Sequence, residues 1–145
     1  MVAVNRTTLL AVVRSKAAGF TQSWSHDGGQ HWAAATPSAI DGAASKPALE
    51  SFRVGSVTKV VLAYNVITRE RMALSSSTDG GVTWSYFATL DNGTSPLVPG
   101  ETSDAYPTVA ATEQELLTTW STYGSGSGSG GGGYNAIKLA RTSLP

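Results

Sequence analysis

A repeated octet carries the acidic side chains whose spacing could support chemistry. Residues 25–32 read Ser-His-Asp-Gly-Gly-Gln-His-Trp, and 52 residues later 77–84 read Ser-Thr-Asp-Gly-Gly-Val-Thr-Trp. Asp27 and Asp79 could serve as catalytic acids or as Ca²⁺ ligands. The alternative is a β-hairpin turn, in which the aspartate accepts hydrogen bonds from backbone N–H groups and the glycines allow positive φ.

The other positions of the octet fit the turn interpretation. A serine or threonine hydroxyl can close the loop, and a tryptophan can cover it by packing onto the sheet. The residues assigned to this structural role are Ser25, Asp27, Gly29 and Trp32 in the first copy, and Ser77, Asp79, Gly81, Thr83 and Trp84 in the second.

Cysteine and histidine chemistry has little support in this chain. With no cysteine there is no disulfide, thiol nucleophile or thiolate metal ligand. His26 and His31 flank a turn without a carboxylate cluster nearby, which favours surface residues over a zinc site. We therefore predict neither a metal nor a cofactor.

Aromatic side chains offer a second kind of chemistry, because four tryptophans and five tyrosines could stack on sugar rings. Trp32 and Trp84 belong to the octets, and Trp120 lies in an apolar run. Trp24 and some tyrosines remain available for a glycan. No motif selects them, so carbohydrate binding stays an alternative.

The elements that position these residues are predicted to be β-strands. Apolar runs such as 9–13, 60–64 and 116–120 are about five residues long, rich in β-branched residues and bounded by Gly, Pro, Asn or Ser. No stretch of eleven or more residues combines a helical apolar period with an N-terminal cap. The fold class is therefore all-β.

The repeat indicates how these strands are arranged. The octet recurs after 52 residues, and a weaker match relates 2–10 to 109–117 at an offset of 107. A pitch near 50 is typical of four-stranded antiparallel propeller blades. We predict a partial β-propeller of about two and three-quarter blades within one segment, 1–145. The blades would span about 1–40, 41–95 and 96–145, with a flexible Gly/Ser hairpin loop at 124–133.

Strand positions follow from the same division of the chain. The predicted strands are 2–4, 8–15, 20–25 and 31–36, then 47–54, 57–67, 71–77 and 83–90, and finally 106–111, 115–123 and 135–143.

Composition excludes several partners. Ten basic and ten acidic residues give a formal charge of zero, which argues against nucleic acid. No apolar run approaches the roughly 20 residues of a membrane-spanning helix. The first residues lack the layout of a signal peptide, and localisation stays undetermined.

The octets and their surroundings resemble the Asp-box, or bacterial neuraminidase repeat, of sialidase-like β-propellers. Over 60–144 the order of features is similar to the C-terminal part of a sialidase-like domain: an apolar strand ending Tyr64-Asn65, the octet 77–84, and 104–108, Asp-Ala-Tyr-Pro-Thr. In that family the boxes are structural turns, usually remote from the active site.

The resemblance implies three site residues. Sialidases bind a sugar carboxylate with three arginines and use a tyrosine nucleophile that a glutamate activates. Arg71 falls where one of these arginines lies, just before a box, and Tyr106 falls where the nucleophile lies. Glu50 is the candidate activating residue. An edge arginine, a packed aromatic and an exposed strand carboxylate are the competing structural interpretations.

Further cations could come from other arginines, but no motif selects among them; they are Arg14, Arg53 and Arg141. The acid/base aspartate and the N-terminal arginine of a sialidase belong to early blades that this chain does not contain. A partial catalytic set is nearly inert, so we leave open whether the chain is an enzyme.

Two functions therefore remain. One is the C-terminal part of a sialidase-like glycoside hydrolase of the exo-α-sialidase type. The other is a non-catalytic propeller module that binds glycans or assembles with other proteins. In both, another chain or upstream blades would complete the propeller, because an unfinished blade exposes an edge strand.

Overall fold

The computed structural model describes residues 1–15, 19–43, 45–66, 68–93, 101–124 and 134–145. These residues form strands and connecting turns without a helix, and no segment among them could cross a membrane as an apolar helix. The strands are β1 (Val2–Ala3), β2 (Leu9–Arg14), β3 (Phe20–Ser25), β4 (Thr36–Pro37), β5 (Ala48–Val54), β6 (Val57–Asn65), β7 (Met72–Ser77), β8 (Ser85–Asp91), β9 (Glu101–Ala111), β10 (Glu115–Gly124) and β11 (Tyr134–Ser143).

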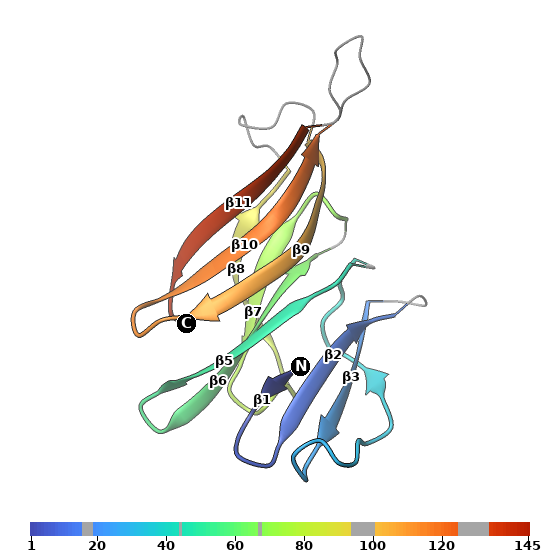
Figure 1. Cartoon of the computed structure of the whole chain (residues 1–145), viewed down its shortest axis with the longest axis vertical. Helices are drawn as coiled ribbons and strands as arrows, with labels where there is room; N and C mark the ends of the chain where they lie inside the picture. Colours follow the sequence, from blue (N-terminus) through green and yellow to red (C-terminus); the bar gives the residue numbers. More distant parts are fainter. Residues whose placement is uncertain (16–18, 44, 67, 94–100, 125–133) are drawn as a thin grey trace.

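The strands form three antiparallel sheets in chain order. The first sheet has the order β1-β2-β3-β4, the second β5-β6-β7-β8, and the third β9-β10-β11. Each strand pairs with its neighbour in sequence, so every sheet is a meander of the kind found in propeller blades. Figure 1 shows the first and third sheets lying against the second, and the three do not close into a ring.

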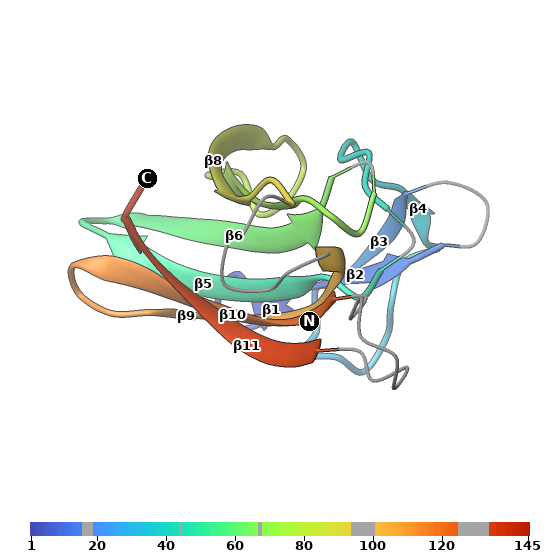
Figure 2. The same ribbon diagram turned by 90° about the horizontal axis from the view of Figure 1, so that it is seen from above.

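The first strand of each sheet lies toward the neighbouring sheet. β5 packs against β9 and also contacts β1, whereas no comparable contact joins the last strands β4, β8 and β11 in the described residues. Seen from above, β9 runs alongside β5 (Figure 2). The innermost strands β1, β5 and β9 therefore converge, which is how propeller blades surround a central axis.

Packing across the second sheet explains why the sheets stay together. Successive side chains of a strand point to opposite faces, and β6 is buried on both. Val60, Leu62 and Tyr64 join a cluster with the first sheet, where Tyr64 meets Phe20 edge-to-face with ring centroids 6.1 Å apart. Val61 and Ala63 join Leu74, Val109 and Leu116 in a cluster with the third sheet.

The predicted fold class is confirmed: an all-β partial propeller with three sheets, the last of only three strands. One predicted strand is largely wrong. Instead of 31–36, β4 covers only Thr36–Pro37, with two pairs to β3. Residues 33–35 are three exposed alanines, which have low strand propensity and supply no side chain to hold them on the sheet.

The third sheet differs in extent from its prediction. β9 begins at Glu101, five residues before the predicted start at 106, and pairs with β10 over this added length. Gly124 ends β10, and the rest of the predicted Gly/Ser loop lies outside the described residues.

Candidate functional site

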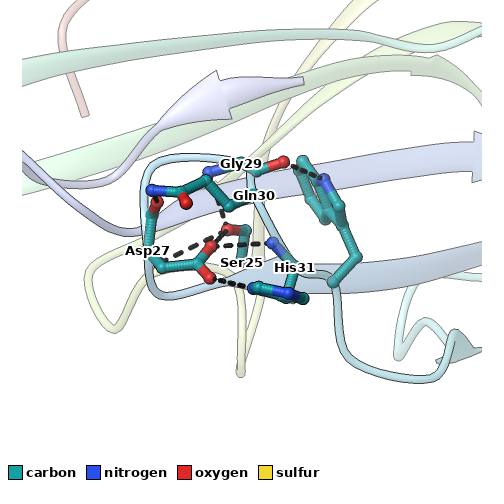
Figure 3. A network of polar contacts seen from close by, with 6 residues as sticks. Ser25, Asp27, Gly29, Gln30 and His31 are labelled. Atoms are coloured by element: carbon teal, nitrogen blue, oxygen red, sulfur yellow. Dashed lines mark hydrogen bonds and ion pairs between the residues drawn. The ribbon is translucent and has the colours of Figure 1, made fainter.

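The first octet forms a compact turn around the Asp27 carboxylate (Figure 3). Asp27 Oδ1 accepts hydrogen bonds from Ser25 Oγ at 2.8 Å and from the His31 backbone N–H at 2.9 Å. Its Oδ2 lies 2.6 Å from His31 Nδ1. Ser25 Oγ in turn accepts the Gly29 N–H at 2.8 Å. Gly29 adopts a φ of 98°, which a side chain would disfavour.

The second octet repeats this arrangement with one substitution. Asp79 Oδ1 accepts Ser77 Oγ at 2.7 Å, and Gly81 N donates to the same Ser77 oxygen at 2.8 Å. Thr83 takes the position of His31 and donates its hydroxyl to Asp79 Oδ2 at 2.5 Å. Gly81 has a φ of 93°, and a Cβ there would lie 2.4 Å from Leu10 Cδ2.

Hydrogen bonds to the charged carboxylates lower both aspartate pKa values. The backbone and side chain of His31 lower the pKa of Asp27 to about 2. The hydroxyl and backbone N–H of Thr83, helped by Ser77, lower the pKa of Asp79 to about 2. Each carboxylate is thus ionised at neutral pH and engaged by its own turn. Such a group is a poor general acid, because an acid needs a pKa near the working pH.

Tyr106 occupies an unusual backbone position. Its φ is 56°, and it is the one non-glycine with positive φ in the described part of the chain. Tyr106 and Pro107 of β9 together face Trp120 of β10, which makes a β-bulge on the innermost strand of the third sheet. The side chain is 51% exposed. A bulky residue held in the left-handed region stores strain, and bulges often re-aim a side chain beside a functional site.

The Tyr106 side chain lines a hollow of about 350 Å³ where the three sheets converge. Val12, Val13 and Arg14 come from the end of β2, Lys46 and Pro47 from the segment before β5, and Met1 from the start of the chain. Burial and then the charge of Lys46 lower the pKa of the Met1 amino group. Two side-chain cations and a phenol thus share one hollow, and it could accept an anionic ligand with an apolar body.

A buried asparagine connects this strand to the loop that carries Arg71. Asn65, the fully buried last residue of β6, donates from Nδ2 to the carbonyls of Arg69 at 3.2 Å and Asp104 at 3.2 Å. It also lies 3.4 Å from the Arg71 carbonyl. The Asp104 N–H donates to the Arg69 carbonyl at 2.5 Å. The β6–β7 loop is therefore fixed against β9, two residues before Tyr106.

Arg71 lines a different hollow from Tyr106. It is exposed and lies beside Val66 and Met72, with Tyr86 and Thr89 of β8 opposite. The Arg71 backbone is connected to β9 through Asn65, whereas Arg71 and Tyr106 line separate hollows among the described residues. The predicted roles of Arg71 and Tyr106 remain predictions.

Glu50 lies in the middle of β5, paired with Val61 of β6. It is half-buried on the strand that packs against β9, and it is not part of the Tyr106 hollow lining. Its role as activating carboxylate also remains a prediction.

The structure adds residues that motif reasoning did not select. Arg14 is one of three arginines that no motif selects, and its position at the end of β2 places it in the lining of the Tyr106 hollow. Lys46 and Asn65 had no sequence signal of their own. In the sequence, Tyr64-Asn65 marks only the end of an apolar strand, and Lys46-Pro47 marks only the beginning of a predicted strand. No group of three or more metal-ligating residues occurs in the described ranges.

Comparison with known proteins identifies the family. The meander sheets and their aspartate-centred turns define a sialidase-like β-propeller segment, and the family model described as BNR repeat-like domain matches residues 1–119. The chain therefore belongs to the BNR repeat-like domain family. A search of curated proteins found no match.

Three solved structures that are similar to this chain are those of a sialidase and of an α-L-arabinofuranosidase. The Hadza microbial sialidase Hz136 superposes with a TM-score of 0.67 and 17% identity over 99% of this chain and 26% of the sialidase. Two structures of an α-L-arabinofuranosidase from Fusarium graminearum, both with an iminosugar inhibitor, give TM-scores of 0.62 and 0.58 at 18% and 20% identity. They are matched over 94% and 79% of this chain and 42% and 37% of their own length. The chain thus spans less than half of these enzymes, and at this identity the likeness concerns the fold.

Proposed function

We propose that this chain is the C-terminal part of a sialidase-like glycoside hydrolase propeller of the exo-α-sialidase type. One observation carries the proposal: Tyr106 sits with a strained backbone in a hollow that also holds Arg14 and Lys46. Strain of this kind persists only where the surroundings enforce it, and it concentrates at functional sites. The substrate would be a glycan that ends in an acidic sugar.

Each candidate residue has its own role in the proposed hydrolysis. The Tyr106 phenol oxygen attacks the anomeric carbon, its proton passes to a carboxylate for which Glu50 is the candidate, and the aglycone leaves. Arg14 and Lys46 supply positive charge for the sugar carboxylate, and the Arg14 guanidinium can hold it bidentately. The substrate-binding role of Arg71, which lines a different hollow, rests on the family resemblance alone. The acid that protonates the leaving oxygen comes from blades that complete the ring.

A fluorogenic sialoside tests this proposal. We expect the folded chain to hydrolyse the sialoside slowly. Tyr106→Phe should reduce this turnover by at least 100-fold, because the phenol oxygen is the nucleophile. Arg14→Ala should chiefly raise KM. Tyr123→Phe on β10 is a matched control for loss of a half-exposed tyrosine hydroxyl. Equal turnover by wild type and Tyr106→Phe would remove the enzyme proposal.

A second candidate is a non-catalytic module that functions by assembly. Ile137 and Leu139 of β11 are 80% and 61% exposed, on the outermost strand of the three-stranded sheet. Their β10 partners Ser121 and Thr119 alternate with the buried residues Trp120 and Thr122, so the two apolar side chains lie on the face turned away from the second sheet. For the 145-residue chain we propose a second copy as the partner that covers this face.

A further inference from the structure

A second hollow lies at the opposite end of the first sheet from Tyr106. It has a volume of about 350 Å³ and lies between the second octet turn and the β1–β2 hairpin. Thr8, just before β2, lines it, whereas Arg14 at the end of β2 lines the Tyr106 hollow. Both octet turns lie at the lower end of their sheets in Figure 1. A ligand here would therefore not touch the candidate catalytic residues.

The wall of this second hollow is largely apolar and centres on an indole. Trp24 of β3 is half-buried and lines it, together with Val4, Gly80 and the 60%-exposed Val82. Trp24 is one of the two tryptophans outside the octets, and the other, Trp120, is buried. Its rigid ring can pack against the C–H face of a pyranose, while the sugar hydroxyls remain at the rim.

Contacts between the first sheet and the second octet turn hold the indole in place. Trp24 Nε1 donates to the Gly80 carbonyl at 2.9 Å, 56 residues along the chain. A Cβ on Gly80 would lie 3.1 Å from Val4 Cγ1, so the turn sits directly against the hairpin. Within the hairpin, Val4 N donates to the Thr8 carbonyl at 2.8 Å. The surface is therefore ordered before a ligand arrives, which lowers the entropy lost on binding.

Polar groups at the rim suit hydroxyl groups. Asn5 Oδ1 accepts the N–H groups of Thr7 and Thr8 at 3.0 and 2.8 Å, which leaves its amide nitrogen as the donor for a ligand. His26 is exposed, with Nδ1 3.5 Å from Thr8 Oγ1, so its Nε2 is the ring atom that a ligand can reach. Both side chains line the hollow.

The charge of Asp79 at this hollow determines whether a neutral or an acidic sugar can bind. Asp79 lines the hollow, and its carboxylate accepts bonds from Ser77 Oγ and from the N–H and hydroxyl of Thr83. These bonds occupy it within its own turn. Its negative charge disfavours a carboxylate or sulfate on a ligand, and the described residues that line this hollow include no lysine or arginine.

We propose that the hollow formed by Trp24, Val4, Val82, Asn5 and His26 binds a neutral pyranose unit of a glycan. This site is independent of Tyr106. It would hold part of a polysaccharide or glycoprotein while another part reaches the opposite end of the molecule. A single sugar ring in a hollow of this size should bind with a dissociation constant on the order of 1 mM.

Saturation-transfer NMR and tryptophan fluorescence with the 145-residue chain test the site. The probes are the methyl pyranosides of galactose, glucose, mannose and N-acetylglucosamine. We expect at least one to bind and to change the emission of Trp24. Val82→Glu and His26→Ala should each weaken binding by at least fivefold, because one fills the wall with a carboxylate and the other removes a rim donor. Val57→Glu, at the start of β6, is the matched control, since Val57 is also exposed.

The outcomes separate this site from the proposed enzyme. Tyr106→Phe should leave pyranoside binding unchanged whether or not the chain hydrolyses a sialoside. Loss of binding in Tyr106→Phe would place the sugar in the other hollow and overturn the inference. It would also be overturned if no neutral pyranoside binds, or if Val82→Glu and His26→Ala bind like the wild type.

Discussion

At the scale of single residues, the backbone of Tyr106 is the strongest sign of a functional site. The family resemblance selected this tyrosine as the candidate nucleophile, but its φ depends on the bulge, which forms only when β9 pairs with β10. Lys46 and Arg14 join it because three sheets converge there. Contacts between residues this far apart in the chain leave no local pattern, so motif reasoning could not find Lys46.

Replacing Tyr106 measures the strain directly. Tyr106→Ala keeps a Cβ in the left-handed region, whereas Tyr106→Gly removes it, and the two share the loss of the half-exposed ring. We expect the glycine variant to be more stable than the alanine variant by about 1 kcal/mol. Urea denaturation of both proteins gives the difference. Equal stability, or a more stable alanine variant, would show that the site carries no strain.

At the scale of elements, the octet turns depend on ionised carboxylates. Their position and their composition of Asp, Gly and Ser were visible in the sequence, because such turns use local hydrogen bonds. The local sequence pattern did not reveal that the second turn packs on the first sheet. This packing uses the Trp24–Gly80 hydrogen bond and the close approach of Gly81 to Leu10. The predicted strand 31–36 was likewise largely wrong. Its position followed from the spacing of the neighbouring strands, and spacing cannot replace side chains that favour a strand.

Acid should weaken these turns over a defined range. The pKa values of Asp27 and Asp79 are lowered from 3.8 to about 2 in the folded chain. Groups with lowered folded pKa values stabilise the protein above pH ~4, and this stabilisation is lost as pH falls toward 2. The wild type should therefore lose stability between pH 5 and 2 more steeply than a variant with Asp27→Asn and Asp79→Asn. Thermal unfolding at stepped pH measures both slopes, and parallel slopes would contradict the assignment.

At the scale of the whole molecule, the second sheet is the centre of the structure. β6 contributes side chains to clusters on both of its faces, so it is buried as an interior blade is. The near-52-residue repeat predicted this architecture, because each repeat is one meander that must be covered by the next. The repeat alone could not tell which residues of an end sheet stay exposed. Ile137 and Leu139 are such residues on the third sheet.

The exposed face of β11 leads to a prediction about assembly. Two large aliphatic side chains on an outermost strand favour burial against a second copy, and the 145-residue chain should therefore elute as a dimer of about twice its 15.0 kDa mass. Light scattering after size exclusion measures this mass. Ile137→Lys with Leu139→Lys should yield a folded monomer, because lysines at this face oppose its burial.

Two controls identify the surface that the second copy uses. Val57→Lys, at the exposed start of β6, should leave the dimer intact. Val13 is 54% exposed near the end of β2, on the opposite end sheet. If the third sheet of one copy covers the first sheet of the next, Val13→Lys also dissociates the assembly. If the third sheets of two copies meet each other, only the variant with both lysines on β11 dissociates, because an isologous contact uses the same patch on both subunits. A wild-type chain that is folded and monomeric would contradict assembly through this face.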